Sequence, residues 1–197
     1  TLHRPDLLFW SRFDEDRNID FNSVLWVRPS GNVVFDPLPA TDHDMRHLAS
    51  LGPVEAIMIT NSDHTRDAVA LAELTGADIY GPSAEKDSFP IACDHWLSNG
   101  DEPFPGLVTY TLDGSKTPGE LAFVLDGTTL VTGDLIRAHA AGSLMLLPSD
   151  KLTSPIDAKA SLARLLEETH LQAVLVGDGW PVFRNGHQRL KELYEAH

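Results

Sequence analysis

The stretch Thr60-Asn61-Ser62-Asp63-His64-Thr65-Arg66-Asp67 decides the fold of this chain. It follows an apolar run over residues 54–59, which predicts a buried strand, and it precedes residues 68–74, which predict a helix. Polar side chains at the carboxyl end of a strand, directly before a helix, are where α/β folds place their sites. The sequence therefore predicts a functional site at this turn.

The composition predicts one globular domain over residues 1–197. The chain is 42% hydrophobic and 22% charged, which is enough apolar material to bury a core without disulfides. The formal charge of −14 opposes nucleic-acid backbones and anionic membrane surfaces, so neither is an expected partner. The single cysteine, Cys93, cannot form an internal disulfide, and the sequence shows neither a signal-peptide pattern nor an apolar run of roughly 18 residues. We therefore expect a cytoplasmic protein, and no pattern in the sequence sets its oligomeric state.

The first half of the chain is expected to alternate strands and helices. Val, Leu, Trp and Phe flank the turn Pro29-Ser30-Gly31, which predicts a β-hairpin with strands at residues 22–28 and 32–35. Thr41 is suited to cap a short helix that ends before Gly52-Pro53. A short strand over residues 77–80 follows the helix after the opening stretch. This order predicts a layered α/β fold.

The second half is expected to contain three antiparallel strands and two helices. Alternation of apolar and polar residues places the strands at residues 107–112, 120–125 and 128–132. Ser154 and Pro155 open a predicted helix over residues 155–169, whose apolar positions are Ile156, Ala160, Ala163 and Leu166. Residues 81–105 are expected to form a surface connection with one helical turn, and residues 143–147 to flank a loop. Residues 173–176 predict a buried strand and residues 185–196 the last helix.

Three predicted strands end in an acid. Asp63 lies in the opening stretch, Asp134 follows Val131-Thr132-Gly133, and Asp178 follows Val176-Gly177. A fourth polar turn, over residues 114–119, joins two predicted strands and contains Lys116. Each feature alone is weak, because Asp beside Gly is more often a turn former than a catalyst. Their order along the chain is more specific than any one of them.

Together these turns resemble the metallo-β-lactamase superfamily over nearly the whole chain. The family motif Thr-His-x-His-x-Asp-His falls on Thr60-Asn61-Ser62-Asp63-His64-Thr65-Arg66, and its His before Thr-Pro-Gly falls on Lys116. Its Gly-Asp, whose carboxylate bridges two metal ions, matches Gly133-Asp134, and its late His falls on Asp178. The resemblance implies an α/β (α+β) fold, a four-layer αββα sandwich with its site at strand ends.

The ligand positions that the resemblance implies have mostly changed residue type. Among them only Asp134 keeps the family residue; the full set is Asn61, Asp63, Thr65, Arg66, Lys116, Asp134 and Asp178. Catalytic zinc is normally held by three protein ligands drawn mostly from His. Arg66 and Lys116 cannot replace a His, because neither a guanidinium nor an ammonium offers a lone pair.

We therefore predict a metal-free site in which Arg66 and Lys116 pair with Asp63, Asp134 and Asp178. Buried charges need partners, so fixed cations in place of metal ions keep the acids ionised. Such a site is expected to bind a small anionic molecule through Arg66 and Lys116, with Asn61 and Asp178 as further ligand-binding positions. No resident cofactor is expected under this interpretation.

The alternative that the resemblance implies is a metal-dependent hydrolase acting on an ester, thioester, amide or phosphoester. One divalent ion would then be held by Asp63, Asp134 and Asp178, and the candidate catalytic residues are Asp134, Asp63 and His64. His64 falls on a variable position of the family motif, between ligands. We therefore expect it to be a loop histidine hydrogen-bonded to backbone rather than a general base or a metal ligand.

Overall fold

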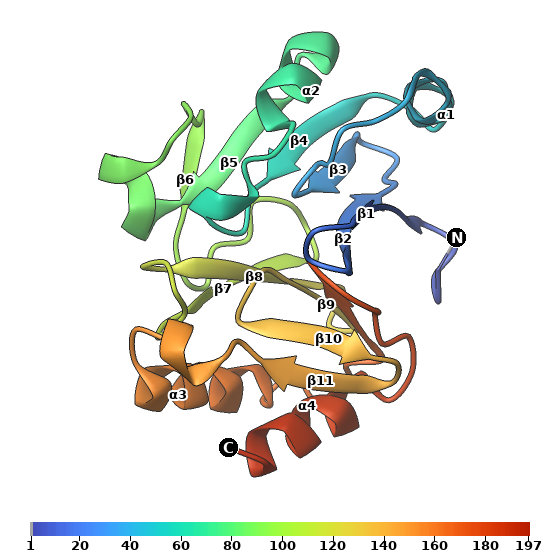
Figure 1. The fold of residues 1–197 in the computed structure, drawn as a ribbon. Helices are drawn as coiled ribbons and strands as arrows, with labels where there is room; N and C mark the ends of the chain where they lie inside the picture. The colour runs from blue at the N-terminus through green and yellow to red at the C-terminus, as the bar shows by residue number, and fades with distance from the viewer. Residues whose placement is uncertain (1) are drawn as a thin grey trace.

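Two β-sheets pack face to face and helices cover their outer faces, which confirms the four-layer αββα fold (Figure 1). The computed structural model describes residues 2–197. The upper sheet in Figure 1 has the strand order β1-β2-β3-β4-β5-β6 and the lower sheet the order β12-β9-β8-β7. Helices α1 (Asp42–Ser50) and α2 (Ala68–Thr75) cover the upper sheet, and α3 (Pro155–Leu165) and α4 (Gly186–Glu195) cover the lower one.

The upper sheet begins with antiparallel strands and continues with parallel ones. The first three strands are antiparallel neighbours, and the register of β2 and β3 pairs Val24 with Phe35, as the predicted hairpin requires. From β3 onward the neighbours are parallel. The strands are β1 (Leu7–Asp14), β2 (Ile19–Trp26), β3 (Asn32–Phe35), β4 (Val54–Met58), β5 (Asp78–Pro82) and β6 (His95–Leu97).

The lower sheet contains the three predicted antiparallel strands, with a fourth strand parallel to β9. Its strands are β7 (Leu107–Leu112), β8 (Glu120–Leu125), β9 (Thr129–Thr132) and β12 (Ala173–Val176). A separate hairpin is formed by β10 (Ile136–Ala140) and β11 (Ser143–Leu146), and the short 3-10 helices are η1 (Ser62–His64), η2 (Ser83–Ser88) and η3 (Ser149–Lys151).

Four strands of the described chain lie where the sequence predicted none. The sequence analysis assigned nothing to β1 or β10, took β6 as part of a surface connection, and took β11 as the flank of a loop. Each is an edge or hairpin strand whose pattern is irregular: β1 is buried only at Leu7, and β11 only at Leu146. Strands that bury little apolar surface carry no clear period of two, so the pattern could not reveal them.

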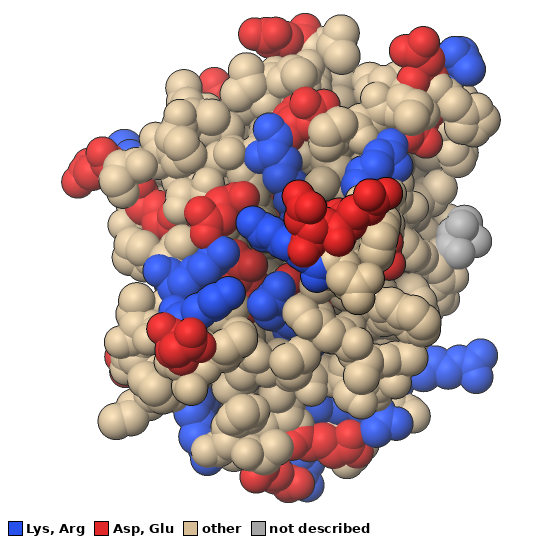
Figure 2. Space-filling model, in the orientation of Figure 1, with Lys and Arg blue, Asp and Glu red and all other residues tan. Residues whose placement is uncertain are grey.

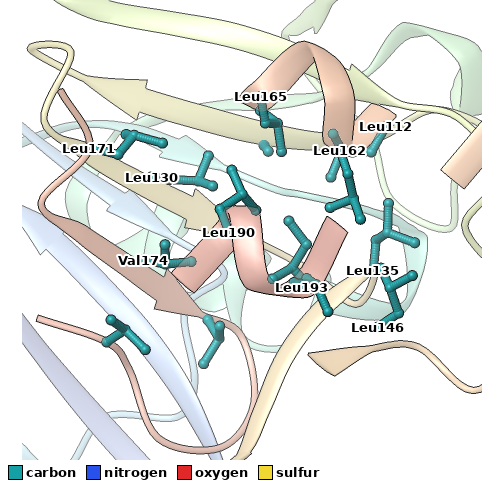
Figure 3. Packing of buried hydrophobic residues seen from close by; sticks show 14 of the residues in the cluster. Leu112, Leu130, Leu135, Leu146, Leu162, Leu165, Leu171, Val174, Leu190 and Leu193 are labelled. Atoms are coloured by element: carbon teal, nitrogen blue, oxygen red, sulfur yellow. The ribbon is translucent and has the colours of Figure 1, made fainter. Parts of the chain in front are cut away.

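The predicted apolar face of α3 was wrong. Ile156 is 82% exposed, and the face that packs on the sheet consists of Ala158, Ser161, Leu162 and Leu165. Figure 3 shows Leu162 and Leu165 from α3 meeting Leu190 and Leu193 from α4. The helix also ends earlier than predicted, with Leu166 as its C-cap. The predicted positions Ala160, Ala163 and Leu166 are also not buried, so the whole face was assigned to the wrong side of the helix.

The functional turns follow the carboxyl ends of β3, β4, β9 and β12. Strands β3 and β4 are parallel neighbours in the upper sheet, and β9 and β12 are parallel neighbours in the lower sheet. Parallel strands point their carboxyl ends toward one edge, so the two sheets bring four turns together. In the described part of the chain, none of the helices has the length and apolar content needed to cross a bilayer.

Leu162→Ala is expected to lower the free energy of unfolding by about 2–5 kcal/mol, because the deletion leaves a cavity between α3 and the lower sheet. Ile156→Ala in the same helix is the matched control and should change stability little, since its side chain is already in solvent. Urea unfolding of both variants measures the difference. Equal losses in the two variants would contradict the assigned packing face.

Candidate functional site

These four turns, together with the turn between β7 and β8 that carries Lys116, surround a cavity of about 430 Å³, which we call the charged pocket. Figure 2 shows Lys and Arg side chains gathered in the middle of this face, with Asp and Glu beside them. The lining residues are Asp14, Arg17, Phe21, Leu38, Asp63, His64, Arg66, Lys116, Asp134, Arg137, Leu147, Lys151 and Asp178. Six of the seven predicted site residues therefore line one pocket: Asp63, His64, Arg66, Lys116, Asp134 and Asp178. The seventh, Asn61, does not line the pocket but is hydrogen-bonded to Asp134.

The opening stretch forms a tight turn that fixes the direction of each side chain. The Asn61 side chain accepts a hydrogen bond from the Asp63 N–H at 3.0 Å, and the His64 N–H donates to the Asn61 carbonyl, also at 3.0 Å. Arg66 has a positive φ of 38°, which a side chain with a Cβ rarely adopts. Strained backbone of this kind persists only where the surroundings hold it in place.

Lys116 joins two of the predicted acids. Its Nζ lies 2.6 Å from the Asp63 carboxylate and 2.8 Å from Asp134 Oδ2. The same Asp134 oxygen accepts a hydrogen bond from Asn61 Nδ2 at 3.1 Å. Burial alone would raise the pKa of Asp134, but His64 and Lys116 overcome this and hold that pKa well below its usual range. Asp134 is therefore a buried, ionised carboxylate with fixed donors on it.

His64 was predicted to be bonded to backbone, and this was wrong. Its side chain is buried, with Nδ1 2.8 Å from Asp36 Oδ2 and Nε2 3.5 Å from Asp134 Oδ1. Burial is the largest influence and opposes the charged form, yet the Asp36 charge and the hydrogen bonds to Asp134 and Asp36 together outweigh it and raise the pKa of His64 to about 9. His64 is consequently an imidazolium between two carboxylates at neutral pH.

Asp36 is a site residue that the sequence analysis treated only as the end of a strand. Its Oδ1 accepts from the Thr60 N–H at 2.8 Å, and its Oδ2 accepts from the Thr60 hydroxyl at 2.7 Å. Like Arg66, Asp36 has a positive φ, here 46°. An Asp directly after a strand, before Pro37, looked like ordinary turn chemistry, so its contact with the turn after β4 was not visible in the sequence.

Arg66 does not pair with an acid, which corrects the predicted network. Its guanidinium donates to the carbonyls of Asn22 at 2.7 Å, Asp36 at 3.0 Å and Gly177 at 3.3 Å. These carbonyls come from segments of both sheets, so the side chain ties the sheets together beneath the pocket. Its pKa is lowered because it is deeply buried, although the charges of nearby acids oppose the shift.

Asp178 pairs with Arg137, not with Arg66 as predicted. Arg137 donates through Nε at 2.6 Å and through a second guanidinium nitrogen to the same Oδ2 of Asp178. His139 Nε2 lies 3.7 Å from that oxygen. Arg137 and His139 are on β10, a strand that the sequence did not reveal, so no signal pointed to either residue.

The residues present do not fit a metal ion. Within residues 2–197, no group of three or more His, Cys, Asp or Glu side chains is arranged to hold one. Lys116 and Asn61 occupy Oδ2 of Asp134, and Arg137 occupies Oδ2 of Asp178. A protonated imidazole has no lone pair, so His64 is not a ligand in this state either. Each carboxylate of the one-ion set Asp63, Asp134 and Asp178 therefore already contacts a cationic side chain, and of Asp178 only the buried Oδ1 lacks a partner among the described residues.

Comparison with known protein families identifies the family of this chain. A family profile described as the metallo-beta-lactamase superfamily matches residues 1–197. The chain belongs to the metallo-β-lactamase superfamily.

Solved metallo-β-lactamases share this fold at low sequence identity. A metallo-β-lactamase from Erythrobacter litoralis, with β-mercaptoethanol in its active site, matches with a TM-score of 0.76 at 14% identity, over 100% of this chain and 96% of its own. One from Pontibacter korlensis gives 0.74 at 12% identity, over 98% and 97%. FIM-1 from Pseudomonas aeruginosa, in its mono-zinc form, gives 0.72 at 14% identity, over 96% and 90%. At these identities the likeness shows the fold alone.

A local likeness to a protein of another class is also present. The glycerol kinase of Methylobacterium radiotolerans is 35% identical over 72 residues. The matched segment is 34% of this chain and 14% of the kinase, so the chain spans a small part of that protein's length. The likeness carries no activity over to this chain.

The stability of the protein is expected to fall between pH 6.5 and pH 9, and His64→Gln should reduce that fall. The folded state raises the pKa of His64 from 6.5 to about 9, so its stabilisation is complete below pH 6.5 and is lost as the pH rises through 9. The full shift corresponds to about 3 kcal/mol. Burial, with the Asp134 charge, also raises the pKa of Glu120 from 4.5 to about 8, which lowers stability between about pH 4.5 and pH 8 and therefore overlaps the lower part of this interval. Denaturant unfolding across this range measures both, and identical pH profiles would contradict the charged state of His64.

Proposed function

We propose that this member of the superfamily binds a small anionic molecule in the charged pocket without a metal ion. The observation that supports this best is the place of the Lys116 ammonium, in contact with both Asp63 and Asp134. In the family pattern these three positions serve metal ions. An ammonium between the two carboxylates supplies the positive charge that keeps them ionised, and it would repel a metal ion at the same place.

The balance of charge in the pocket favours an anionic ligand. Its lining contains five Lys or Arg side chains and four Asp, and the positive charge of His64 is balanced by Asp36 beside it. The chain as a whole carries a formal charge of −14, so the pocket differs in sign from its surroundings. A cationic concavity with low-dielectric walls concentrates anions from solution.

Two cations of the pocket remain available to such a ligand. Lys116 already pairs with two carboxylates, Arg66 donates to backbone carbonyls, and Arg137 pairs with Asp178. Arg17 and Lys151 line the same pocket and form no ion pair with any described residue. The sequence analysis assigned anion binding to Arg66 and Lys116; we now assign it to Arg17, on the turn between β1 and β2, and to Lys151, in η3.

The size of the pocket sets the class of ligand. A volume of about 430 Å³ is in the usual range for small-molecule sites. Two cations from different elements, Arg17 and Lys151, suit a ligand with two negative charges or one doubly charged group. We therefore propose a phosphate monoester or a small dicarboxylate.

Orthophosphate is expected to raise the melting temperature of the protein, measured by differential scanning calorimetry against sodium chloride at equal ionic strength. At a concentration about 100-fold above its Kd, a ligand stabilises the folded state by roughly 2.7 kcal/mol. Zinc and manganese chlorides should give no such increase. Stabilisation by these metal ions and not by phosphate would contradict the proposal and favour the metal-dependent hydrolase.

Lys151→Ala is expected to weaken phosphate binding about tenfold, the equivalent of losing one charge-assisted hydrogen bond worth ~1.4 kcal/mol. Lys191→Ala on α4 is the control, because Lys191 is an exposed lysine whose removal changes the charge equally. Isothermal titration calorimetry with phosphate measures both affinities. Equal weakening in the two variants would mean that only net charge matters and would exclude a built site.

A further inference from the structure

Strand β1 forms a long sheet edge whose outward backbone groups after Leu7 have no strand or loop paired with them in the described chain. The outer side of β7 is covered, because Thr109 exchanges backbone hydrogen bonds with the loop at Gly100 and Asp101. On β12, Val174 exchanges two such bonds with Val182. The other edge of the upper sheet, β6, has only three residues. Strand β1 has eight residues in regular register with β2, and its other side has no neighbouring strand.

The direction of the free backbone groups on β1 follows from contacts on β2. Ser11 lies opposite Asn22, whose N–H donates to Gly177, away from β1. Phe13 lies opposite Asp20, whose carbonyl accepts from Gly179, also away from β1. In an antiparallel pair without mutual hydrogen bonds, both residues turn their N–H and C=O groups outward. Ser11 and Phe13, and by alternation Phe9, therefore point these groups to the open side.

The free edge is limited at one end by the chain itself. Leu7 has the same alternation, and its carbonyl is taken by the Leu2 N–H at 2.9 Å. The open ladder thus comprises Phe9, Ser11 and Phe13, and Ser11 is its centre. The Ser11 carbonyl accepts only from the side chain of the next residue, Arg12, at 2.9 Å.

We propose that two copies of this chain associate through antiparallel pairing of their β1 strands about a two-fold axis at Ser11. This register places each Ser11 opposite Ser11 of the second copy, and each Phe9 opposite Phe13 of the second copy. It forms about six main-chain hydrogen bonds with the pattern of an antiparallel ladder. The upper sheets of the two copies become one continuous sheet.

The side chains on this edge suit the same register. Phe9 is 37% exposed and Phe13 is 58% exposed, and both lie on the face of β1 that carries Phe183. Aromatic pairs directly opposite each other on antiparallel strands stabilise a sheet. A two-fold interface must be self-complementary, and the Phe9–Phe13 pairs occur twice by symmetry.

The charges along the β1 edge of one copy also complement those of a second copy that runs antiparallel to it. Beyond Phe13, the turn carries the exposed acids Glu15 and Asp16. Near the opposite end, the hollow beside Phe9 is lined by Arg184, an exposed residue without an ion pair among the described residues. Antiparallel pairing brings the acidic turn of one copy toward Arg184 of the other. A parallel arrangement would instead place acid against acid.

Pairing of the two β1 strands requires one small side-chain rearrangement and leaves the fold unchanged. Arg12 must release the Ser11 carbonyl, but it keeps its ion pair with Asp44, at 2.7 Å. Asp14 at the end of β1 and Arg17 in the turn that follows it both line the charged pocket. Association would therefore hold one wall of the pocket in place. The inference stands on the edge geometry and does not depend on the proposed ligand.

Sedimentation velocity at physiological ionic strength tests the proposal with the unmodified chain, which should sediment as a dimer that dissociates on dilution. Phe13→Lys should shift the equilibrium to monomer, because it removes both Phe9–Phe13 pairs and places an ammonium opposite the Phe9 ring of the other copy. Leu74→Lys on α2 is the matched control, since Leu74 is an exposed apolar side chain far from β1, and it should leave the dimer unchanged. A monomer at every concentration would overturn the proposal, as would equal dissociation in both variants.

A charge swap tests the register itself. Arg184→Glu alone should dissociate the dimer, and adding Glu15→Arg and Asp16→Arg should restore it. Circular dichroism of each variant separates loss of association from loss of folding. Amide hydrogen exchange provides a second measure: the N–H groups of Phe9, Ser11 and Phe13 should become protected as protein concentration rises. A dimer whose β1 amides exchange freely would place the interface elsewhere and overturn the proposal.

Discussion

The site depends on the Asp134 carboxylate, which is held between the Lys116 ammonium and the His64 imidazolium. Asp134 is buried, and a buried carboxylate without partners would lose its charge or destabilise the fold by several kcal/mol. Its two partners come from different turns, one after β4 and one between β7 and β8. The ion pairs therefore fix the positions of both turns relative to the end of β9, and the shape of the pocket follows.

Around Asp134, the cationic side chains His64 and Arg66 are themselves held by groups from other strands and turns. His64 is anchored by Asp36 at the end of β3, and Arg66 by carbonyls from the segments before β3 and after β12. Two of the five non-glycine residues with positive φ in the described chain, Asp36 and Arg66, lie here. The site is a connected set of charges and strained backbone, in which each element restrains the next. Such a set can replace the bonds that a metal ion makes to several strands at once.

The sequence was sufficient for most strands, because alternation and turn residues are local patterns, and the family resemblance supplied the four layers. It also predicted the contact of Lys116 with Asp63 and Asp134, since the family layout puts these positions together. It failed for Arg66 and Asp178. Whether a guanidinium meets a carboxylate or a carbonyl depends on packing between residues as far apart as Arg66 and Gly177. Arg137 competes for Asp178 from a strand with no clear pattern.

The central claim is that side-chain cations occupy the place of metal ions in this superfamily member. Elemental analysis of protein purified without chelators, after equilibration with zinc, iron and manganese salts and removal of free ions, tests it most directly. The charge arrangement around Asp134 predicts well under one metal ion per chain for each element. Lys116→His serves as the comparison, because it replaces the ammonium by an imidazole with a lone pair. Stoichiometric metal in the unmodified protein would contradict the account.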